Sequence, residues 1–233
     1  MARGFGTVLG SASTDRIVTT VTATNVATSY SLWLNRGSGA GGAAAGRLWD
    51  KDGELGIYWW TNNNRIHFFR TWSSAVGEWN IALPSTGVWH HLLVTYNGGS
   101  VDNDPIFYLD GSAVAATENG TPSGTIVTNS NPLYLGNAYY SGAYSRVFDG
   151  SLAEFAIWNS ILTAANARSL IDGVLPTAIE SPVCYFPIPG DSNPEPDSSG
   201  NGYTGTVTGT LKTTHPTFPT PLTPSLTESL IYG

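Results

Sequence analysis

Carboxylates and histidines are the residues of this 233-residue chain whose types and spacing could support catalysis. A retaining glycosidase requires two carboxylates about 5 Å apart, which a Glu-x-Asp-x-(x)-Glu pattern along one strand provides. The nearest string is Glu195-Pro196-Asp197, which has no second glutamate and lies in a proline-rich stretch. These residues therefore do not predict a sugar-cleaving enzyme.

Other catalytic patterns are excluded by geometry or by absence. His90 and His91 are consecutive in an expected strand and point to opposite faces, so they cannot bind one metal ion together. The sequence has no Gly-x-Ser-x-Gly motif to form the nucleophile elbow of a serine hydrolase. Residues 37–42 match the spacing Gly-x-Gly-x-x-Gly, but a dinucleotide site needs a helix after that loop, and here a hairpin follows. We therefore expect the protein not to be an enzyme.

Two acidic loops could supply the hard oxygen ligands that calcium prefers. The residues are Asp50, Asp52 and Glu54 in one loop and Asp102, Asn103 and Asp104 in the other. The Asp52-Gly53 pair is already explained as the corner of a hairpin, so Asp102 and Asp104 are the better candidates. Asp and Asn also form turns without any metal, and that alternative stays open. No other cofactor is expected.

Four of the eight tryptophans are candidates for binding a glycan or a protein partner. Trp59 and Trp60 are adjacent in an expected strand, so one of them must face away from whatever the other packs on. An outward indole could stack on a sugar ring or anchor a partner. Trp72 and Trp79 lie near loops and are similar candidates. The tryptophans expected in the core instead are Trp33, Trp89 and Trp158.

The elements that would position these residues are strands. The chain contains 27 glycines, 14 prolines and 12% aromatic residues, a mixture that favours short strands and many turns over helices. Alternating segments recur at spacings of about 8–15 residues, and together they predict an all-β, two-sheet antiparallel jelly-roll sandwich. One short helix is expected between an N-cap at Thr163 and a C-terminal Gly173.

Charge and composition exclude several classes of partner. The formal net charge is −7 and the ten basic residues are scattered, so neither nucleic acid nor an anionic membrane surface is an expected partner. Cys184 is the only cysteine, which excludes an intrachain disulfide. The sequence shows no apolar run long enough to span a membrane and no apolar core of a secretory signal, so we expect synthesis in a cytoplasm.

Five separated segments resemble the laminin-G-like, concanavalin-A-like jelly rolls. They are residues 89–96, 108–111, 133–136 and 148–159 and the short helix that ends at Gly173. The resemblance covers residues 12–175. Residues 197–209 look like the stretch that usually opens such domains, yet here they come last. This order implies either a circular permutation, which we favour, or the beginning of a truncated second copy.

The expected organisation is one sandwich over residues 1–212 and a proline-rich extended tail over residues 213–233. The sandwich includes C-terminal strands within residues 181–209. Whether residues 176–233 complete the sandwich or form a separate arm stays open at this point.

His215-Pro216 resembles the end of such domains in tailed-phage structural proteins. That resemblance implies a non-enzymatic virion protein of a bacteriophage, either a capsid decoration (cement) protein or a tail-associated protein. Its partners would be other virion proteins such as the major capsid protein, and a homo-oligomer, for example a trimer, is expected. The alternative is a glycan-binding, lectin-like module for host adsorption. That alternative predicts an exposed aromatic platform beside acidic or amide side chains, and the surface glycan would be its partner.

Overall fold

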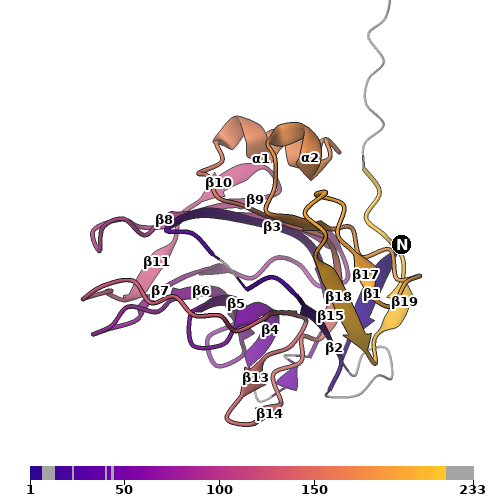
Figure 1. Cartoon of the computed structure of the whole chain (residues 1–233), viewed down its shortest axis with the longest axis horizontal. Coiled ribbons are helices and arrows are strands. Elements are labelled where there is room, and N and C mark those ends of the chain that lie inside the picture. Colours follow the sequence, from indigo (N-terminus) through magenta and orange to yellow (C-terminus); the bar gives the residue numbers. More distant parts are fainter. Residues whose placement is uncertain (7–13, 23, 40, 43–44, 219–233) are drawn as a thin grey trace, which may run out of the picture.

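The computed structural model describes residues 1–6, 14–22, 24–39, 41–42 and 45–218. Two large antiparallel sheets pack face to face, with two short helices outside one of them (Figure 1). The predicted all-β sandwich is therefore confirmed.

One sheet, called sheet A, contains strands from both ends of the chain. Its strands are β1 (Ala2–Phe5), β3 (Ala27–Arg36), β8 (Trp89–Asn97), β9 (Ile106–Leu109), β10 (Ser112–Val114), β15 (Gly150–Trp158), β16 (Cys184–Phe186) and β19 (Leu211–Thr213). Their order is β10-β9-β8-β3-β15-β1-β19, and β16 also pairs with β15.

The opposite sheet is called sheet B. Its strands are β2 (Arg16–Thr19), β4 (Ala45–Lys51), β5 (Leu55–Trp60), β6 (Arg65–Arg70), β7 (Gly77–Ala82), β11 (Thr117–Gly120), β12 (Leu133–Leu135), β17 (Glu195–Pro196) and β18 (Thr204–Thr208). Their order is β11-β7-β6-β5-β4-β12-β2-β18-β17. A separate hairpin of β13 (Tyr139–Tyr140) and β14 (Ala143–Tyr144) projects from the side of sheet B that faces away from sheet A (Figure 1).

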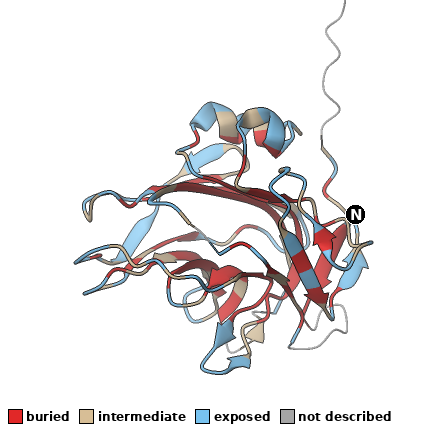
Figure 2. Cartoon of the chain, viewed as in Figure 1, coloured by how far each residue is buried: buried red, intermediate tan, exposed pale blue. Residues whose placement is uncertain are grey.

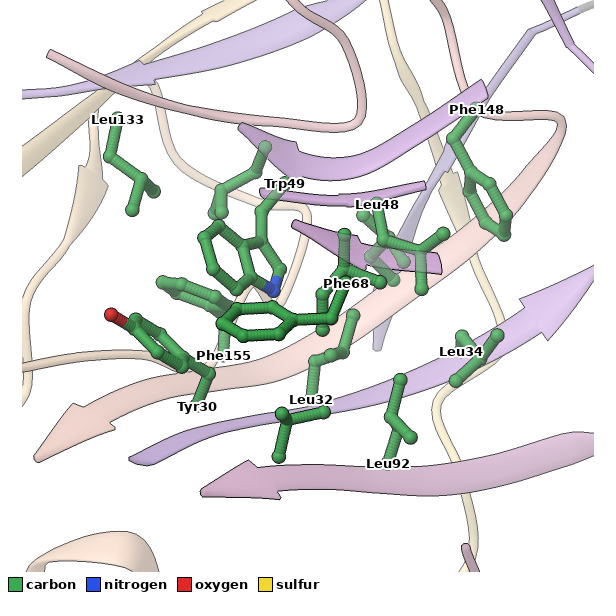
Figure 3. Close-up of a cluster of buried hydrophobic side chains, with 14 of the residues drawn as sticks. Tyr30, Leu32, Leu34, Leu48, Trp49, Phe68, Leu92, Leu133, Phe148 and Phe155 are labelled. Carbon is green, nitrogen blue, oxygen red and sulfur yellow. The ribbon is translucent and has the colours of Figure 1, made fainter. Parts of the chain in front are cut away.

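The core lies between the two sheets and follows from the alternation of side chains along each strand. Tyr30, Leu32 and Leu34 of β3 point toward Trp49 and Phe68 of sheet B (Figure 3). The Tyr30 ring stacks on Trp49 with centroids 4.5 Å apart. Each such buried aromatic or aliphatic side chain contributes about 1.5–3 kcal/mol.

The helices lie on the outer face of sheet A. The predicted helix is α1 (Ala164–Ile171), and Thr163 caps it by accepting a hydrogen bond from the Asn166 backbone N–H. A second helix, α2 (Pro176–Ile179), follows it and was not predicted from the sequence. Leu170 of α1 packs into an apolar cluster with Trp158 of β15, which explains why this face of sheet A is apolar.

The C-terminal strands are part of the same sandwich. β1 pairs with β15 on one side and with β19 on the other, and β18 pairs with β2. Arg3 Nε donates to Glu195 Oε1 at 2.5 Å in a buried ion pair, which ties β1 to β17. Residues 184–213 therefore contribute strands to both sheets.

The segment 214–218 packs onto the outer face of sheet A. His215 Nε2 lies 2.7 Å from Glu154 Oε1, and the Phe218 ring meets the Trp33 ring edge-on with centroids 5.5 Å apart. The rest of the predicted tail, residues 219–233, lies outside the described residues. In the part of the chain that the structure describes, neither helix is long and apolar enough to cross a membrane.

Candidate functional site

The outer faces of the two sheets differ in what covers them. Both helices lie over sheet A and turn their exposed residues away from it (Figure 2). Beneath them, side chains such as Leu93 and Trp158 are completely buried. The outer face of sheet B carries mostly half-buried side chains instead, with His67 and Asn80 buried among them. We call it the open face, with the members Arg47, Tyr58, Trp60, Arg65, His67, Phe69, Glu78 and Asn80.

Strand register places polar and aromatic side chains side by side on the open face. Asn80 pairs with His67, His67 with Tyr58, and Tyr58 with Arg47, so these residues form one row across β7, β6, β5 and β4. Their strand neighbours, such as Phe68, have the opposite parity and enter the core.

Glu78 is held by two donors on the open face. His67 Nδ1 lies 2.7 Å from Glu78 Oε1, and the Tyr58 hydroxyl donates to the same oxygen at 2.5 Å. When His67 carries its proton on Nδ1 and donates it to Glu78, its Nε2 accepts a hydrogen bond from the Asn63 amide at 3.0 Å. The hydrogen bond from His67, helped by that from Tyr58, lowers the pKa of Glu78 despite its partial burial. Burial and the neighbouring Glu78 raise the pKa of Tyr58. Glu78 is therefore a fixed acceptor whose side chain is 27% exposed.

Aromatic rings surround this polar group. The Tyr58 ring stacks on His67 with centroids 5.0 Å apart, and the Trp60 ring meets His67 edge-on at 5.4 Å. Phe69 continues the array, 6.1 Å from Tyr58. Trp60 is half-buried, so part of its ring is open to solvent. Aromatic rings thus lie beside the Glu78 carboxylate and two amides, Asn63 and the buried Asn80.

Arginines lie along the same face. The Arg47 guanidinium sits 4.3 Å from the Tyr58 ring centroid, and its Nε donates to Asp50 Oδ2 at 2.8 Å. Burial raises the pKa of Asp50 to about 6, although Arg47 acts in the opposite direction. Next to this pair, Arg146 covers the Tyr140 ring and Arg16 covers the Tyr144 ring of the β13–β14 hairpin.

Three of the four tryptophans that were predicted to bind a glycan or a partner do not lie on an outer face. Trp59, Trp72 and Trp79 are only 3%, 6% and 1% exposed and belong to the core between the sheets. They cannot stack on a ligand, because the parity of their strands or bridges turns them inward; this corrects the prediction for these three. Trp60 is the candidate that faces outward.

Of the tryptophans expected in the core, Trp33 and Trp158 are buried, whereas Trp89 is half-buried.

The sequence reasoning did not single out Tyr58, His67, Glu78 or Asn80. A signal for them exists, because His67 alternates with Ile66 and Phe68, and Asn80 alternates with Trp79 and Ile81. Polar residues between such large apolar ones in a sandwich strand belong on an outer face.

Asp102 and Asp104 line an open pocket of about 240 Å³ together with Thr95 and Asn97. Asp104 Oδ1 accepts the Trp79 indole N–H at 2.7 Å, and Asp102 Oδ2 accepts from the Ser100 hydroxyl. Among the described residues, His, Cys, Asp and Glu side chains form no group of three that could hold a metal ion. Calcium binding by Asp102 and Asp104 therefore stays a prediction, which a calcium titration followed by thermal unfolding tests.

A larger pocket of about 410 Å³ lies where β3 and β19 end and β15 begins. Its lining is made of glycines, hydroxyl side chains, Asn35 and Arg36, and it includes no aromatic ring. It offers hydrogen bonds without a stacking surface, so the open face is the better candidate for binding a sugar.

The two sheets and their strand order define a concanavalin A-like jelly-roll sandwich. A laminin-G-type family model, described as the concanavalin A-like lectin/glucanases superfamily, matches residues 10–168. The chain belongs to this superfamily. No curated protein matches the sequence.

Several solved structures share the fold. A proposed carbohydrate-binding protein from Bacteroides ovatus has a TM-score of 0.64 and 17% identity, over 90% of this chain and 58% of its own length. A heptameric SAP-like pentraxin from Limulus polyphemus has a TM-score of 0.51 and 15% identity, over 88% of this chain and 94% of its own. The binding domain of Paraclostridial Mosquitocidal Protein 1 has a TM-score of 0.50 and 12% identity, over 66% and 40%. At these identities the likeness shows the fold.

Proposed function

We propose that the protein is a carbohydrate-binding module and that it binds a glycan on the open face around Trp60. The observation that carries the proposal is the partly exposed Trp60 residue beside the fixed His67–Glu78–Tyr58 group. A sugar has apolar C–H patches and a rim of hydroxyl groups, so a site for it needs a flat aromatic surface and preplaced hydrogen-bonding groups.

The buried members of the open face prepare it for binding. His67 and Asn80 are 0% and 2% exposed, so they orient the groups around them. His67 fixes Glu78, and the Asn80 amide donates to the Asn119 side chain at 2.7 Å. A ligand then meets acceptors that are already ordered, which lowers the entropic cost of binding.

The superfamily and one neighbour support the same class. The description of the superfamily model names lectins and glucanases, and the Bacteroides ovatus structure is that of a proposed carbohydrate-binding protein. This is the lectin-like alternative derived from the sequence. The virion and capsid role stays a prediction, because none of these neighbours bears on it.

The carboxylates on the open face are already engaged by neighbouring side chains, which favours binding over hydrolysis. Glu78 on β7 accepts hydrogen bonds from His67 and Tyr58. Asp50 on β4 accepts one from Arg47. A glycosidase needs two carboxylates that can act on the two sides of one glycosidic bond.

A second pair of potentially catalytic residues, a serine and a histidine, lies in an enclosed cavity. Ser31 Oγ lies 2.8 Å from His91 Nε2, which has the geometry of a nucleophile and its base. Both line a cavity of about 10 Å³ that Phe218 helps to close. That volume holds about one water molecule, so a substrate does not reach the pair in this conformation.

The test is a glycan array followed by calorimetric titration of the best-retained oligosaccharide. We expect retention of the wild-type chain and a loss of affinity of about tenfold or more for Trp60→Ala, because truncating an anchoring indole removes a central contact. Trp60→Phe keeps an aromatic plane and should retain most of the affinity. Failure to retain any glycan, or equal affinity of Trp60→Ala and the wild type, would overturn the proposal.

A further inference from the structure

We infer that the pocket where β3 and β19 end and β15 begins binds a small anionic ligand, one that carries a carboxylate, sulfate or phosphate group beside hydroxyl groups. The pocket shares no lining residue with the open face, so the inference goes beyond the proposed function and does not depend on it. Its basis is the Arg36 guanidinium, which the fold holds in place without an ion pair.

The pocket has the size and the surface of a site for a small polar molecule. Its volume of about 410 Å³ falls within the range of ligand pockets, roughly 300–1,000 Å³. Hydroxyl groups reach it from three parts of the chain, with Ser38 after β3, Thr86 before β8 and Ser151 in β15. Arg36 is the one charged residue among the described residues that line it. A ligand there would meet several hydroxyl groups and a single positive charge.

Three contacts hold the Arg36 side chain in place. Its Nε donates to the Pro84 carbonyl at 2.7 Å, and its Nη1 donates to the Gly37 carbonyl at 3.4 Å. The guanidinium also lies 5.0 Å from the ring centroid of Trp59, a buried residue of sheet B. Gly37 lines the pocket itself, and Pro84 belongs to the loop that contributes Thr86 to the lining. The guanidinium therefore lies between two loops that border the pocket, with its orientation fixed before a ligand arrives.

The charge of Arg36 has lost water without gaining an ion pair. Burial lowers the pKa of Arg36, so part of the hydration of the guanidinium is gone. Among the described residues, no carboxylate lies within ion-pair distance of it. The buried Asp149 accepts a hydrogen bond from the Gly39 N–H at 2.9 Å and is not part of the lining. Because an opposite charge stabilises a partly desolvated cation, an anion in the pocket would supply what the fold does not.

The remaining donors of Arg36 indicate the chemistry of the ligand. The guanidinium keeps N–H groups that do not donate to the two carbonyls. Such groups match the paired oxygens of a carboxylate, a sulfate or a phosphate. Hydroxyl side chains both donate and accept, which suits hydroxyl groups beside the anion. Since the described lining includes no aromatic ring, charge and hydrogen bonds must hold the ligand.

Calorimetric titrations with small probes test the inference. The anionic probes are inorganic phosphate, sulfate, glucuronate and glucose 6-phosphate, and glucose is the neutral control. We expect at least one anionic probe to bind about tenfold or more tightly than glucose, and its affinity to fall between about 20 mM and about 300 mM salt as the charges are screened. Glucuronate against glucose 6-phosphate separates a carboxylate from a phosphate ligand, and inorganic phosphate against glucose 6-phosphate measures what the hydroxyl groups add. Failure of every anionic probe to bind would overturn the inference.

Matched variants at Thr86 locate the site without altering Arg36. Thr86 is exposed, so both replacements leave the core intact. Thr86→Glu places a carboxylate in the lining and should weaken anion binding about tenfold or more, whereas Thr86→Gln lacks the charge and should stay within about twofold of wild type. Arg36→Gln should abolish binding, with thermal unfolding to confirm that this variant is folded. Equal affinity of Thr86→Glu and Thr86→Gln would contradict the assignment of the pocket.

The same variants separate this site from the proposed glycan site. Trp60→Ala should leave anion binding unchanged, and Thr86→Glu should leave retention on the glycan array unchanged. If no glycan is retained but Thr86→Glu still weakens anion binding, the anion site stands while the proposed function fails. Anion binding that Trp60→Ala removes and Thr86→Glu preserves would place the anion on the open face and overturn the inference.

Discussion

Trp59 and Trp60 are consecutive residues of β5 with opposite environments. Trp59 is 3% exposed and belongs to the core, whereas Trp60 is half-buried on the open face. The alternation of side chains along a strand separates the two indoles by the thickness of the sheet. One adjacent pair therefore allows structural and binding contributions to be compared at nearly the same position in the chain.

Alanine substitutions should separate the two roles. Trp59→Ala is expected to lower the free energy of unfolding by about 3–5 kcal/mol, because it leaves a large cavity in the core. Trp60→Ala should change it by less than about 1 kcal/mol. Urea unfolding followed by circular dichroism measures both. A larger loss for Trp60→Ala than for Trp59→Ala would contradict the assigned faces.

Asp50 should give the protein a pH-dependent stability. Its pKa in the folded chain is about 6, above the unfolded value near 3.9, because of burial. The folded state therefore binds the proton more tightly, and the contribution of Asp50 to stability falls as the pH rises from about 4 to about 6.

Asp50→Asn cannot ionise and should remove this fall, which amounts to about 1–3 kcal/mol. Unfolding free energies at pH 4 and pH 7 measure the change. Asp172→Asn, at the exposed C-cap of α1, controls for the loss of one negative charge. An identical pH dependence in wild type and Asp50→Asn would refute the role of Asp50.

At the scale of elements, the segment 214–218 acts as a cover on sheet A. Phe218 packs edge-on against Trp33, and His215 contacts Glu154 of β15. Phe218→Ala uncovers part of the Trp33 ring and should cost about 1–2 kcal/mol of stability, while Phe218→Leu should cost less. Thermal or urea unfolding provides the measurement. Glycan binding should not change, because the segment lies on the sheet opposite the open face. If Phe218→Ala left the stability unchanged, the contact with Trp33 would not hold the segment in place.

Much of the strand pattern was predictable because local alternation specifies it. Residues 65–70 and 89–96 read as strands from their apolar periodicity, and both are strands, β6 and β8. The strand β1 was not predicted, since its sequence ARGF has little alternation. Its place between β15 and β19 depends on pairing with residues that are far away in the sequence.

The candidate site was predictable only in part for the same reason. Trp60 could be identified as one of two adjacent tryptophans, but the direction of each depends on which face of β5 meets the core. The association of Tyr58, His67 and Glu78 depends on the register of three strands, β5, β6 and β7. Register across strands is a tertiary property, so no local sequence motif indicates this group.

At the scale of the whole molecule, the outer faces of the two sheets differ in what covers them. Sheet A is covered by helices and by the chain's own segment 214–218, and it provides stability (Figure 1). Sheet B carries aromatic, amide and charged side chains on its outer face. A rigid sheet positions these groups more accurately than a loop would, which suits recognition of a ligand with weak individual contacts.

The central claim is that the open face binds a glycan, and amide chemical-shift mapping tests it most directly. A ¹⁵N-labelled chain would be titrated with the glycan that the array retains best. The account predicts the largest shift changes in β5, β6 and β7 and at the Trp60 indole N–H, with α1 and α2 unaffected. Changes confined to the pocket near Asp102 and Asp104, or to the pocket at the ends of β3 and β15, would contradict it.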